Sequence, residues 1–145
     1  SSVIPSVRMG DGVVIRVGDR SSIFTPEVTS FLLDAAGRVK STDKRFKFQR
    51  KLMDAGTCES TIYNRFGYTN AAVCIPLGNY HNQNQRTGNI AAEYVWLDDL
   101  ENMVKLFLEV VKQSQKVGTF LKPKAPKYRQ TGGVLGEFFI TESKS

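Results

Sequence analysis

Ala71-Ala72-Val73-Cys74-Ile75-Pro76 is an apolar run that predicts a buried β-strand over about residues 70–77. It is the most apolar of three candidate strands, so we expect it to be the central one. His81 follows it closely and is the only histidine among the 145 residues. A histidine just beyond a buried strand occupies the place where α/β enzymes hold catalytic and metal-binding groups.

Two more strands and a helix precede this run. Val13-Val14-Ile15-Arg16-Val17 and residues 45–52 predict the strands. Thr25 and Pro26 suit the N-cap and the first residue of a helix. Apolar residues then recur every three or four positions up to Val39, as in a helix with one buried face.

Two more helices complete the pattern. Residues 59–66 predict a short helix after the Gly56-Thr57 turn, and Asp98-Asp99 begin a longer one. We expect the long helix to bury the apolar stripe Leu100, Val104, Phe107, Leu108 and Val111. The alternation of strands and helices predicts an α/β fold with three layers, α/β/α, around a parallel or mixed sheet.

Length and composition indicate one domain with a tail. The predicted units are residues 1–117, which form the α/β domain, and residues 118–145, a basic tail that contains Pro and Gly. No apolar run approaches the roughly 20 residues needed to span a bilayer, and no secretory leader is visible. We therefore expect no membrane partner and a cytoplasmic location. Cys58 and Cys74 could be paired or free, and the sequence leaves both open.

The net charge of +6 invites a nucleic-acid interpretation. Phe46 and Phe48 alternate with cations between Lys44 and Lys51, a pattern that single-strand binding proteins also use. The same alternation is typical of a strand with one solvated face and one buried face. The strand interpretation is favoured, and nucleic acid is an unlikely partner.

Residues from about 10 to 115 resemble the C-terminal part of the catalytic domain of co-catalytic zinc exopeptidases. The resemblance includes the deblocking and glutamyl aminopeptidases that form tetrahedral assemblies, and the related carboxypeptidase and acylase branch. Three segments carry it: Ala55-Gly56-Thr57-Cys58-Glu59, Gly78-Asn79-Tyr80-His81 and Glu93-Tyr94-Val95-Trp96-Leu97-Asp98-Asp99-Leu100. The first corresponds to a Gly-Gly-Thr-Asp-Ala turn, and the second carries the last metal-binding histidine of those families.

The resemblance implies a peptidase that uses two divalent metal ions, zinc by the family pattern, to hydrolyse peptides from one end. His81 corresponds to the terminal zinc ligand; the alternative is a hydrogen-bonded loop histidine. The resemblance places the other ligands and the general-base glutamate upstream of this chain. Since a catalytic zinc needs about three protein ligands, we expect the chain to be a segment of a larger, homo-oligomeric enzyme and to be inactive alone.

The resemblance also implies substrate-binding residues. They are Gly56, Thr57, Glu59, Asn79 and Tyr80. Glu59 could instead stabilise the start of its helix, and the last two could simply shape their loop. Cys58 stands where the family has an aspartate. That departure favours a second hypothesis, in which the chain is a non-catalytic α/β interaction domain that kept the peptidase fold.

Overall fold

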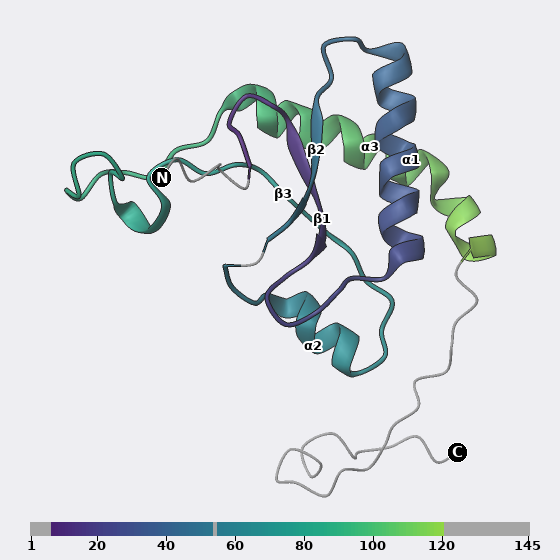
Figure 1. The fold of residues 1–145 in the computed structure, drawn as a ribbon. Coiled ribbons are helices and arrows are strands. Elements are labelled where there is room, and N and C mark those ends of the chain that lie inside the picture. The colour runs from purple at the N-terminus through teal and green to yellow at the C-terminus, as the bar shows by residue number, and fades with distance from the viewer. Residues whose placement is uncertain (1–6, 54, 121–145) are drawn as a thin grey trace, which may run out of the picture.

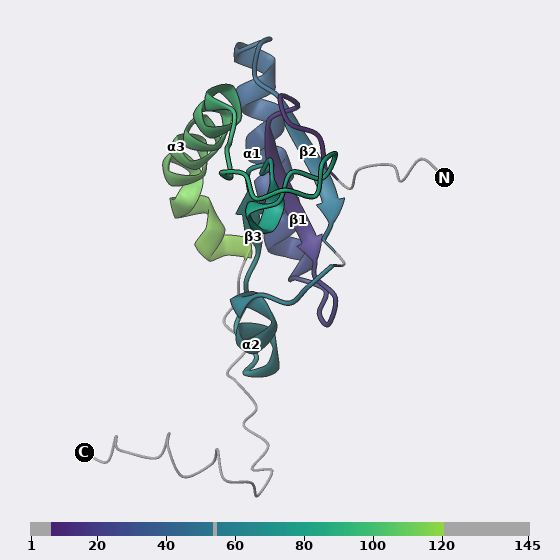
Figure 2. The same cartoon turned by 90° about the vertical axis from the view of Figure 1, so that its left-hand side faces the viewer.

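The computed structural model describes residues 7–53 and 55–120. Figure 1 shows its helices and strands in one view, and Figure 2 turns the same ribbon by 90°. In chain order the elements are β1 (Val13–Gly18), α1 (Pro26–Thr42), β2 (Phe48–Leu52), α2 (Glu59–Arg65), β3 (Ala72–Cys74), the 3-10 turn η1 (Tyr80–Asn82) and α3 (Leu97–Phe120). The predicted mixed α/β fold is confirmed.

The described strands form one mixed sheet in the order β2-β1-β3. β1 is parallel to β2, with Val13 beside Phe48, and antiparallel to β3, with Val14 beside Cys74. The parallel pair is joined by α1, as a parallel connection requires a crossover. The antiparallel pairing of β3 makes the sheet mixed.

The prediction that residues 70–77 form the central strand is wrong for the described residues. β1 is central, and its Val13, Val14 and Ile15 are fully buried. β3 has only three residues, all half-buried. The apolar composition of a strand therefore did not predict its position in the sheet. β1 is buried because β2 and β3 pair with its two edges and helices cover it.

The core lies between the sheet and the two long helices. α1 and α3 pack against each other and against β1, and Figure 2 shows both on the same side of the sheet. The central contacts join Ile15 of β1, Ala36 of α1 and Leu106 of α3, with Phe46 beside them. Burial of the larger of these side chains, Ile15, Leu106 and Phe46, contributes roughly 1.5–3 kcal/mol each.

The first helix begins where the sequence predicts. Pro26 is its first residue and Thr25 its N-cap, but the Thr25 side chain does not cap the helix. Its Oγ1 accepts a hydrogen bond from the Asn70 amide at 3.1 Å, while the Thr25 amide donates to Asn70 O at 3.0 Å. The start of α1 is thereby attached to the segment that leads into β3.

The predicted apolar stripe of the last helix does not face this core. Four of its five residues are exposed, and the fifth, Leu100, is partly buried; the exposed ones are Val104, Phe107, Leu108 and Val111. The buried side instead carries Leu106 together with the polar residues Asp99 and Asn102. α3 therefore has apolar side chains on two sides, and hydropathy alone could not tell which side packs.

Three further observations concern predictions about the whole chain. α3 runs to Phe120, so the proposed boundary at residues 117 and 118 falls within it, and residues 121–145 lie outside the described part. No described helix is long and apolar enough to cross a membrane. Cys58 and Cys74 are free thiols, and burial raises the pKa of Cys74.

Candidate functional site

His81 lies on an arm, residues 78–94, that projects away from the sheet (Figure 1). Backbone hydrogen bonds close the base of the arm, from Gly78 N to Tyr94 O at 2.8 Å and from Tyr94 N to Gly78 O at 3.2 Å. A side chain at Gly78 would place its Cβ 2.3 Å from the Tyr94 ring. Glycine is therefore needed for the two sides of the arm to approach.

The turn that presents His81 has an unusual backbone. Asn79, His81 and Asn82 have φ angles of 52°, 61° and 55°, in the left-handed region. This region is uncommon for residues other than glycine, although asparagine and histidine enter it more often than most others. The His81 amide donates a hydrogen bond to Glu93 Oε1 at 2.9 Å, which holds the turn against the far side of the arm.

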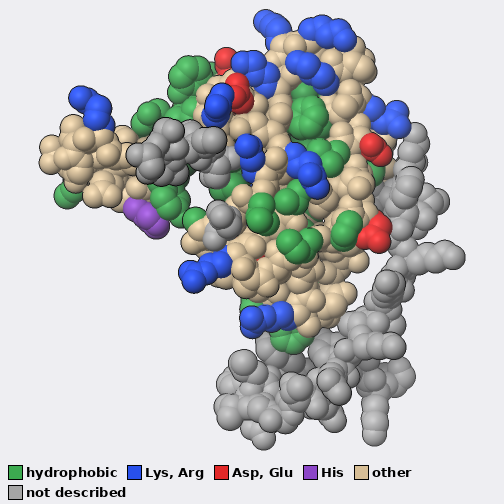
Figure 3. Space-filling view, viewed as in Figure 1, with side chains coloured by type: hydrophobic (Ala, Val, Ile, Leu, Met, Phe, Trp, Pro, Cys, Tyr) green, Lys and Arg blue, Asp and Glu red, His purple; other side chains and the backbone are tan. Residues whose placement is uncertain are grey.

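The His81 imidazole is accessible. Its ring centroid lies 4.0 Å from that of Tyr80, and Figure 3 shows its side chain on the surface of the arm. Among the described residues, no hydrogen bond to either ring nitrogen is present. Whichever nitrogen is unprotonated in the neutral ring is therefore free to coordinate a metal ion, and the loop-histidine alternative has no ring partner to support it.

His81 could supply one ligand of a metal site, but the described residues do not supply the others. Within residues 7–53 and 55–120, no three His, Cys, Asp or Glu side chains come together as a metal site would need. His81 fits as one imidazole donor, and Glu93 is the nearest carboxylate bonded to its turn. A catalytic zinc uses about three protein ligands, so the described residues alone do not hold one.

The two other predicted residues of the arm have different surroundings. Asn79 Nδ2 donates to Ala92 O at 2.8 Å, so this amide stabilises the arm itself. Tyr80 is exposed, and its ring lies tilted against that of His81. The Asn79 bond supports the loop-shaping alternative for that group, while a substrate contact at either residue stays a prediction.

The predicted Gly56-Thr57 turn is attached to the end of β1 by a buried carboxylate. Asp19 Oδ2 accepts hydrogen bonds from the Cys58 amide at 3.0 Å, the Cys58 thiol at 3.3 Å and the Thr61 hydroxyl at 2.6 Å. Its Oδ1 accepts bonds from the amides of Ser21 and Ser22. The cluster joins β1, the turn and α2 through one side chain.

These bonds keep Asp19 ionised. Burial by itself would raise its pKa, but the hydrogen bonds from Thr61, from the Ser21 and Cys58 amides and from Ser22 outweigh burial. The net result is a pKa well below the ordinary value for aspartate. The charge is thus compensated by donors alone.

The predicted residues beside this cluster face solvent. Gly56, Thr57 and Glu59 are exposed, and Arg20 N donates to Gly56 O at 3.0 Å. Glu59 is the first residue of α2. No hydrogen bond to its carboxylate is present among the described residues. Its two interpretations, substrate contact and helix-start carboxylate, therefore both stay open.

The five predicted substrate residues form two groups rather than one pocket. Figures 1 and 2 place α2 at one end of the described fold and the arm at another. Asn79, Tyr80 and His81 lie together on the arm, whereas Gly56, Thr57 and Glu59 lie together at the turn.

Sequence reasoning missed the residues that hold both groups. Asp19 is separated from Cys58 by 39 positions, and Glu93 from His81 by 12. The sequence did contain one indication for Asp19. It directly follows a strand rich in β-branched residues, and binding sites of α/β proteins lie at the ends of such strands. Glu93 belonged to the quoted Glu-Tyr-Val segment but was given no role.

Comparison with known proteins gives a family and a fold. The sequence model of the M42 glutamyl aminopeptidase family matches residues 2–106. No curated protein matches the chain. The TET aminopeptidase from a marine sediment Thaumarchaeota archaeon superposes with a TM-score of 0.59 at 21% identity, covering 79% of this chain and 30% of that one.

Two further solved structures are similar. The Desulfurococcus kamchatkensis aminopeptidase APDkam598 gives a TM-score of 0.54 at 27% identity, covering 72% of this chain and 28% of that one. The Pyrococcus horikoshii TET1 peptidase, which assembles into a tetrahedron or a large octahedral shell, gives 0.53 at 25% identity, with 72% and 27% covered. The chain thus spans less than a third of the length of each of these enzymes.

Proposed function

The chain belongs to the M42 glutamyl aminopeptidase family, and from that membership we propose that it is the His81-bearing part of a metal-dependent aminopeptidase. The observation that carries the proposal is the imidazole itself. The only histidine of the chain lies on the projecting arm with both ring nitrogens free of hydrogen bonds among the described residues. An exposed imidazole without a hydrogen-bond partner is better suited to binding a metal ion than to stabilising the fold.

The residues of the arm would position that imidazole. The Glu93 carboxylate fixes the His81 backbone at 2.9 Å, and the Tyr80 ring lies against the imidazole. Two divalent metal ions, zinc on the family pattern, would activate a water molecule and polarise a peptide carbonyl. Asn79, Tyr80, Gly56, Thr57 and Glu59 would contact the peptide, with the two groups on different sides of it.

The family resemblance places the further donors and the general-base glutamate upstream of this chain, and the described residues contain no group of three metal donors. We therefore propose that the 145-residue chain does not hydrolyse peptides alone. By analogy with the dodecamer and the shells formed by the P. horikoshii TET1 peptidase, the complete enzyme would be a homo-oligomer, acting in the cytoplasm.

A second candidate function rests on Cys58. By the family resemblance this residue stands where an aspartate is expected, and its thiol and amide are both bonded to Asp19. The position thus serves the internal structure of the turn, as expected for a non-catalytic interaction domain that kept the fold. The His81 side chain, with no such internal bond, favours the peptidase.

The test compares the full-length protein with the 145-residue chain. Metal content is measured by mass spectrometry, and hydrolysis is followed on peptides with free and with acetylated N-termini. We expect about two metal ions and aminopeptidase activity only in the full-length protein, both reduced by His81→Ala. Arg86→Ala, a substitution on the same arm, is the matched control and leaves both unchanged. Unaltered metal content and hydrolysis in His81→Ala would contradict the peptidase proposal.

A further inference from the structure

One short segment carries the whole net charge of the chain. Residues 38–51 contain seven of the 20 Lys and Arg and one of the 14 Asp and Glu. Outside this segment, thirteen basic residues therefore balance thirteen acidic ones. The net charge of +6 is not spread over the molecule but belongs to these fourteen residues.

The fold places this segment along one edge of the sheet. It comprises the last turn of α1, the turn that follows and nearly all of β2. Figure 3 shows Lys and Arg side chains gathered over the region where α1 leads into β2, with few acidic side chains among them. We call this surface, residues 38–51, the basic edge.

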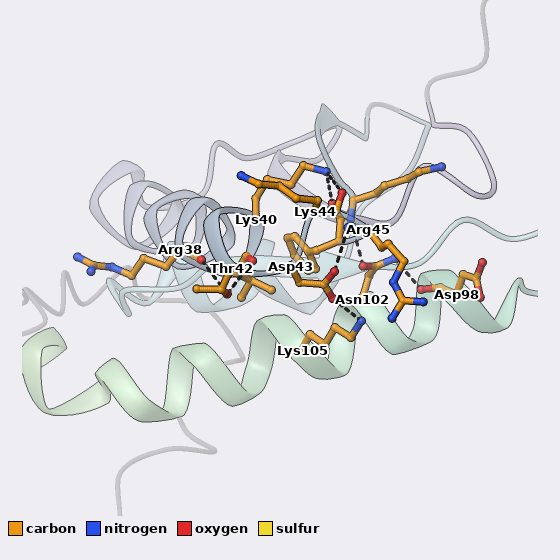
Figure 4. A network of polar contacts seen from close by, with 12 residues as sticks. Arg38, Lys40, Thr42, Asp43, Lys44, Arg45, Asp98, Asn102 and Lys105 are labelled. Carbon is orange, nitrogen blue, oxygen red and sulfur yellow. Dashed lines mark hydrogen bonds and ion pairs between the residues drawn. The ribbon is translucent and has the colours of Figure 1, made fainter.

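Two of the seven cations are used within the fold. Lys40 Nζ donates to Lys44 O at 2.8 Å and to Phe46 O at 2.6 Å, and Lys47 Nζ donates to Gly10 O at 2.8 Å. The one acidic residue, Asp43, is bonded to Lys105 at 2.7 Å. Figure 4 shows the bonds of Lys40 and of Asp43, with the Arg38 guanidinium pointing away from them.

The other five cations have no ion pair with a side chain in the described part of the chain. They are Arg38, Lys44, Arg45, Arg50 and Lys51. Lys51 also lies in register with Arg16 of β1, and the buried Arg16 Nε has no hydrogen-bond partner there. Like charges side by side on neighbouring strands are unfavourable unless an anion lies near them.

β2 is an edge strand among the strands that the structure describes. Among the described strands it pairs only with β1, so one side of its backbone meets no other strand. A surface groove of about 300 Å³ runs beside the start of β2. Its lining is Asp11, Lys40, Phe46, Lys47, Phe48 and Gln49.

We propose that the basic edge binds an extended acidic peptide, which adds as a strand to the outer side of β2. Main-chain hydrogen bonds to the free edge would give affinity, as in other complexes formed by strand addition. Because side chains alternate along β2, Arg50 and Lys51 point to opposite faces of the sheet. An added strand would therefore meet a cation on either side.

The same observations disfavour the two other occupants of such an edge. A second copy would bring an identical set of cations, and cations on edge strands oppose pairing of that kind. A single-stranded nucleic acid needs exposed aromatic rings for base stacking. Phe46 is fully buried and Phe48 partly buried, so the basic edge provides no stacking surface.

The test uses a fluorescent decapeptide of alternating Glu and Val, followed by polarisation at low salt. Arg50→Glu with Lys51→Glu is the test variant of the full chain. Arg65→Glu with Arg86→Glu is the control, since both arginines are exposed elsewhere and the net charge changes equally. We expect affinity to fall about tenfold or more in the first and less than about threefold in the second. Circular dichroism confirms that both variants are folded.

Two further probes decide the binding mode. A Glu-Val peptide with alternate amides N-methylated keeps its charge but cannot form a ladder, so its affinity should be much lower. Equal binding of this peptide, or equal losses in the two double variants, would overturn the proposal. So would an oligothymidine that binds more tightly than the peptide and is lost with Arg50→Glu and Lys51→Glu, because the edge would then recognise phosphates.

Discussion

Asp19 accepts two hydrogen bonds from Cys58. Both reach its Oδ2, one from the Cys58 amide at 3.0 Å and one from the Cys58 thiol at 3.3 Å. The position at which related peptidases are expected to carry an aspartate thus already faces a buried carboxylate in this chain. Two carboxylates at this separation would repel each other, and one would have to bind a proton. A cysteine at this position, unlike an aspartate, can donate to Asp19 without adding a second charge.

This relationship predicts opposite results for two substitutions. Cys58→Asp should lower the free energy of unfolding by about 2–4 kcal/mol, since it brings a second charge to a buried site. Cys58→Ser should cost less than about 1 kcal/mol, because a hydroxyl can donate to Asp19 as the thiol does. Urea denaturation at neutral pH measures both. A Cys58→Asp chain as stable as the parent would show that the Asp19 cluster is not a constraint.

Acid stability should depend on Asp19. Its pKa is lowered in the folded chain, so its contribution is fully present above the ordinary pKa of about 4 and is lost as the pH falls toward the folded value. Asp19→Asn should be less stable at pH 7 and should lose less stability between pH 5 and pH 2. Urea denaturation across this range measures the slope.

The control for acid stability is Asp43. A hydrogen bond from Lys105 is the first cause that lowers the Asp43 pKa, so this residue adds to the same slope. Asp43 is partly exposed, and its effect should be smaller because solvent screens it. If Asp43→Asn reduces the pH dependence of the free energy of unfolding more than Asp19→Asn does, Asp19 is not the main source of the acid sensitivity.

Two glycine-to-alanine changes should have opposite signs. Gly12 has a φ of +87°, and a Cβ there would lie 1.8 Å from Lys47 O. Gly12→Ala should destabilise the chain by about 2–4 kcal/mol. Gly37 is within α1 with nothing near its Cβ position, so Gly37→Ala should stabilise by about 0.5–1 kcal/mol. Thermal denaturation of the pair gives the comparison, and equal effects would contradict the assigned backbone.

Asp99 should be essential for the loop that precedes β1. Its fully buried carboxylate accepts the amides of Gly10 at 2.8 Å and Gly12 at 2.7 Å. Asp99→Ala leaves two amides without acceptors and should cost about 2–3 kcal/mol. Hydrogen exchange of these two amides should accelerate. The exposed neighbour Asp98→Ala is the control, expected within about 1 kcal/mol.

The backbone at His81 predicts a stability gain. Because its φ is 61°, His81→Gly should be about 0.5–1 kcal/mol more stable than His81→Ala. Asn82→Gly should gain less over Asn82, since asparagine tolerates its φ of 55°. Differential scanning calorimetry can resolve both. A His81→Gly chain less stable than His81→Ala would mean that the turn is not strained, and that the histidine is not kept at the expense of stability.

Local signals in the sequence predicted the elements well. Thr25-Pro26 marked the start of α1, and Glu59 the start of α2, because caps and first-turn residues act within a few positions. The mixed α/β fold followed from the order of elements. These predictions depend only on neighbours along the chain.

Predictions that depended on distant pairing were less successful. The sequence could not show that β1 rather than β3 is central, since strand order depends on contacts with β2 more than thirty positions away. It could not choose between the two apolar sides of α3. The partners of Asp19 in α2 and its turn, and the closure of the arm at Gly78 and Tyr94, could not be predicted for the same reason.

The hydrogen bonds between Asp99 and the Gly10–Gly12 loop can form only late in the synthesis of the chain. The two partners are 87 positions apart, and Leu106 of the core comes later still. At about 5–20 residues per second, a ribosome needs roughly 4–20 s to make the residues between them. Throughout that interval the side chains of Val13 and Ile15 are covered by α1 but lack α3, the second helix of their core, so part of their apolar surface stays exposed until α3 is made.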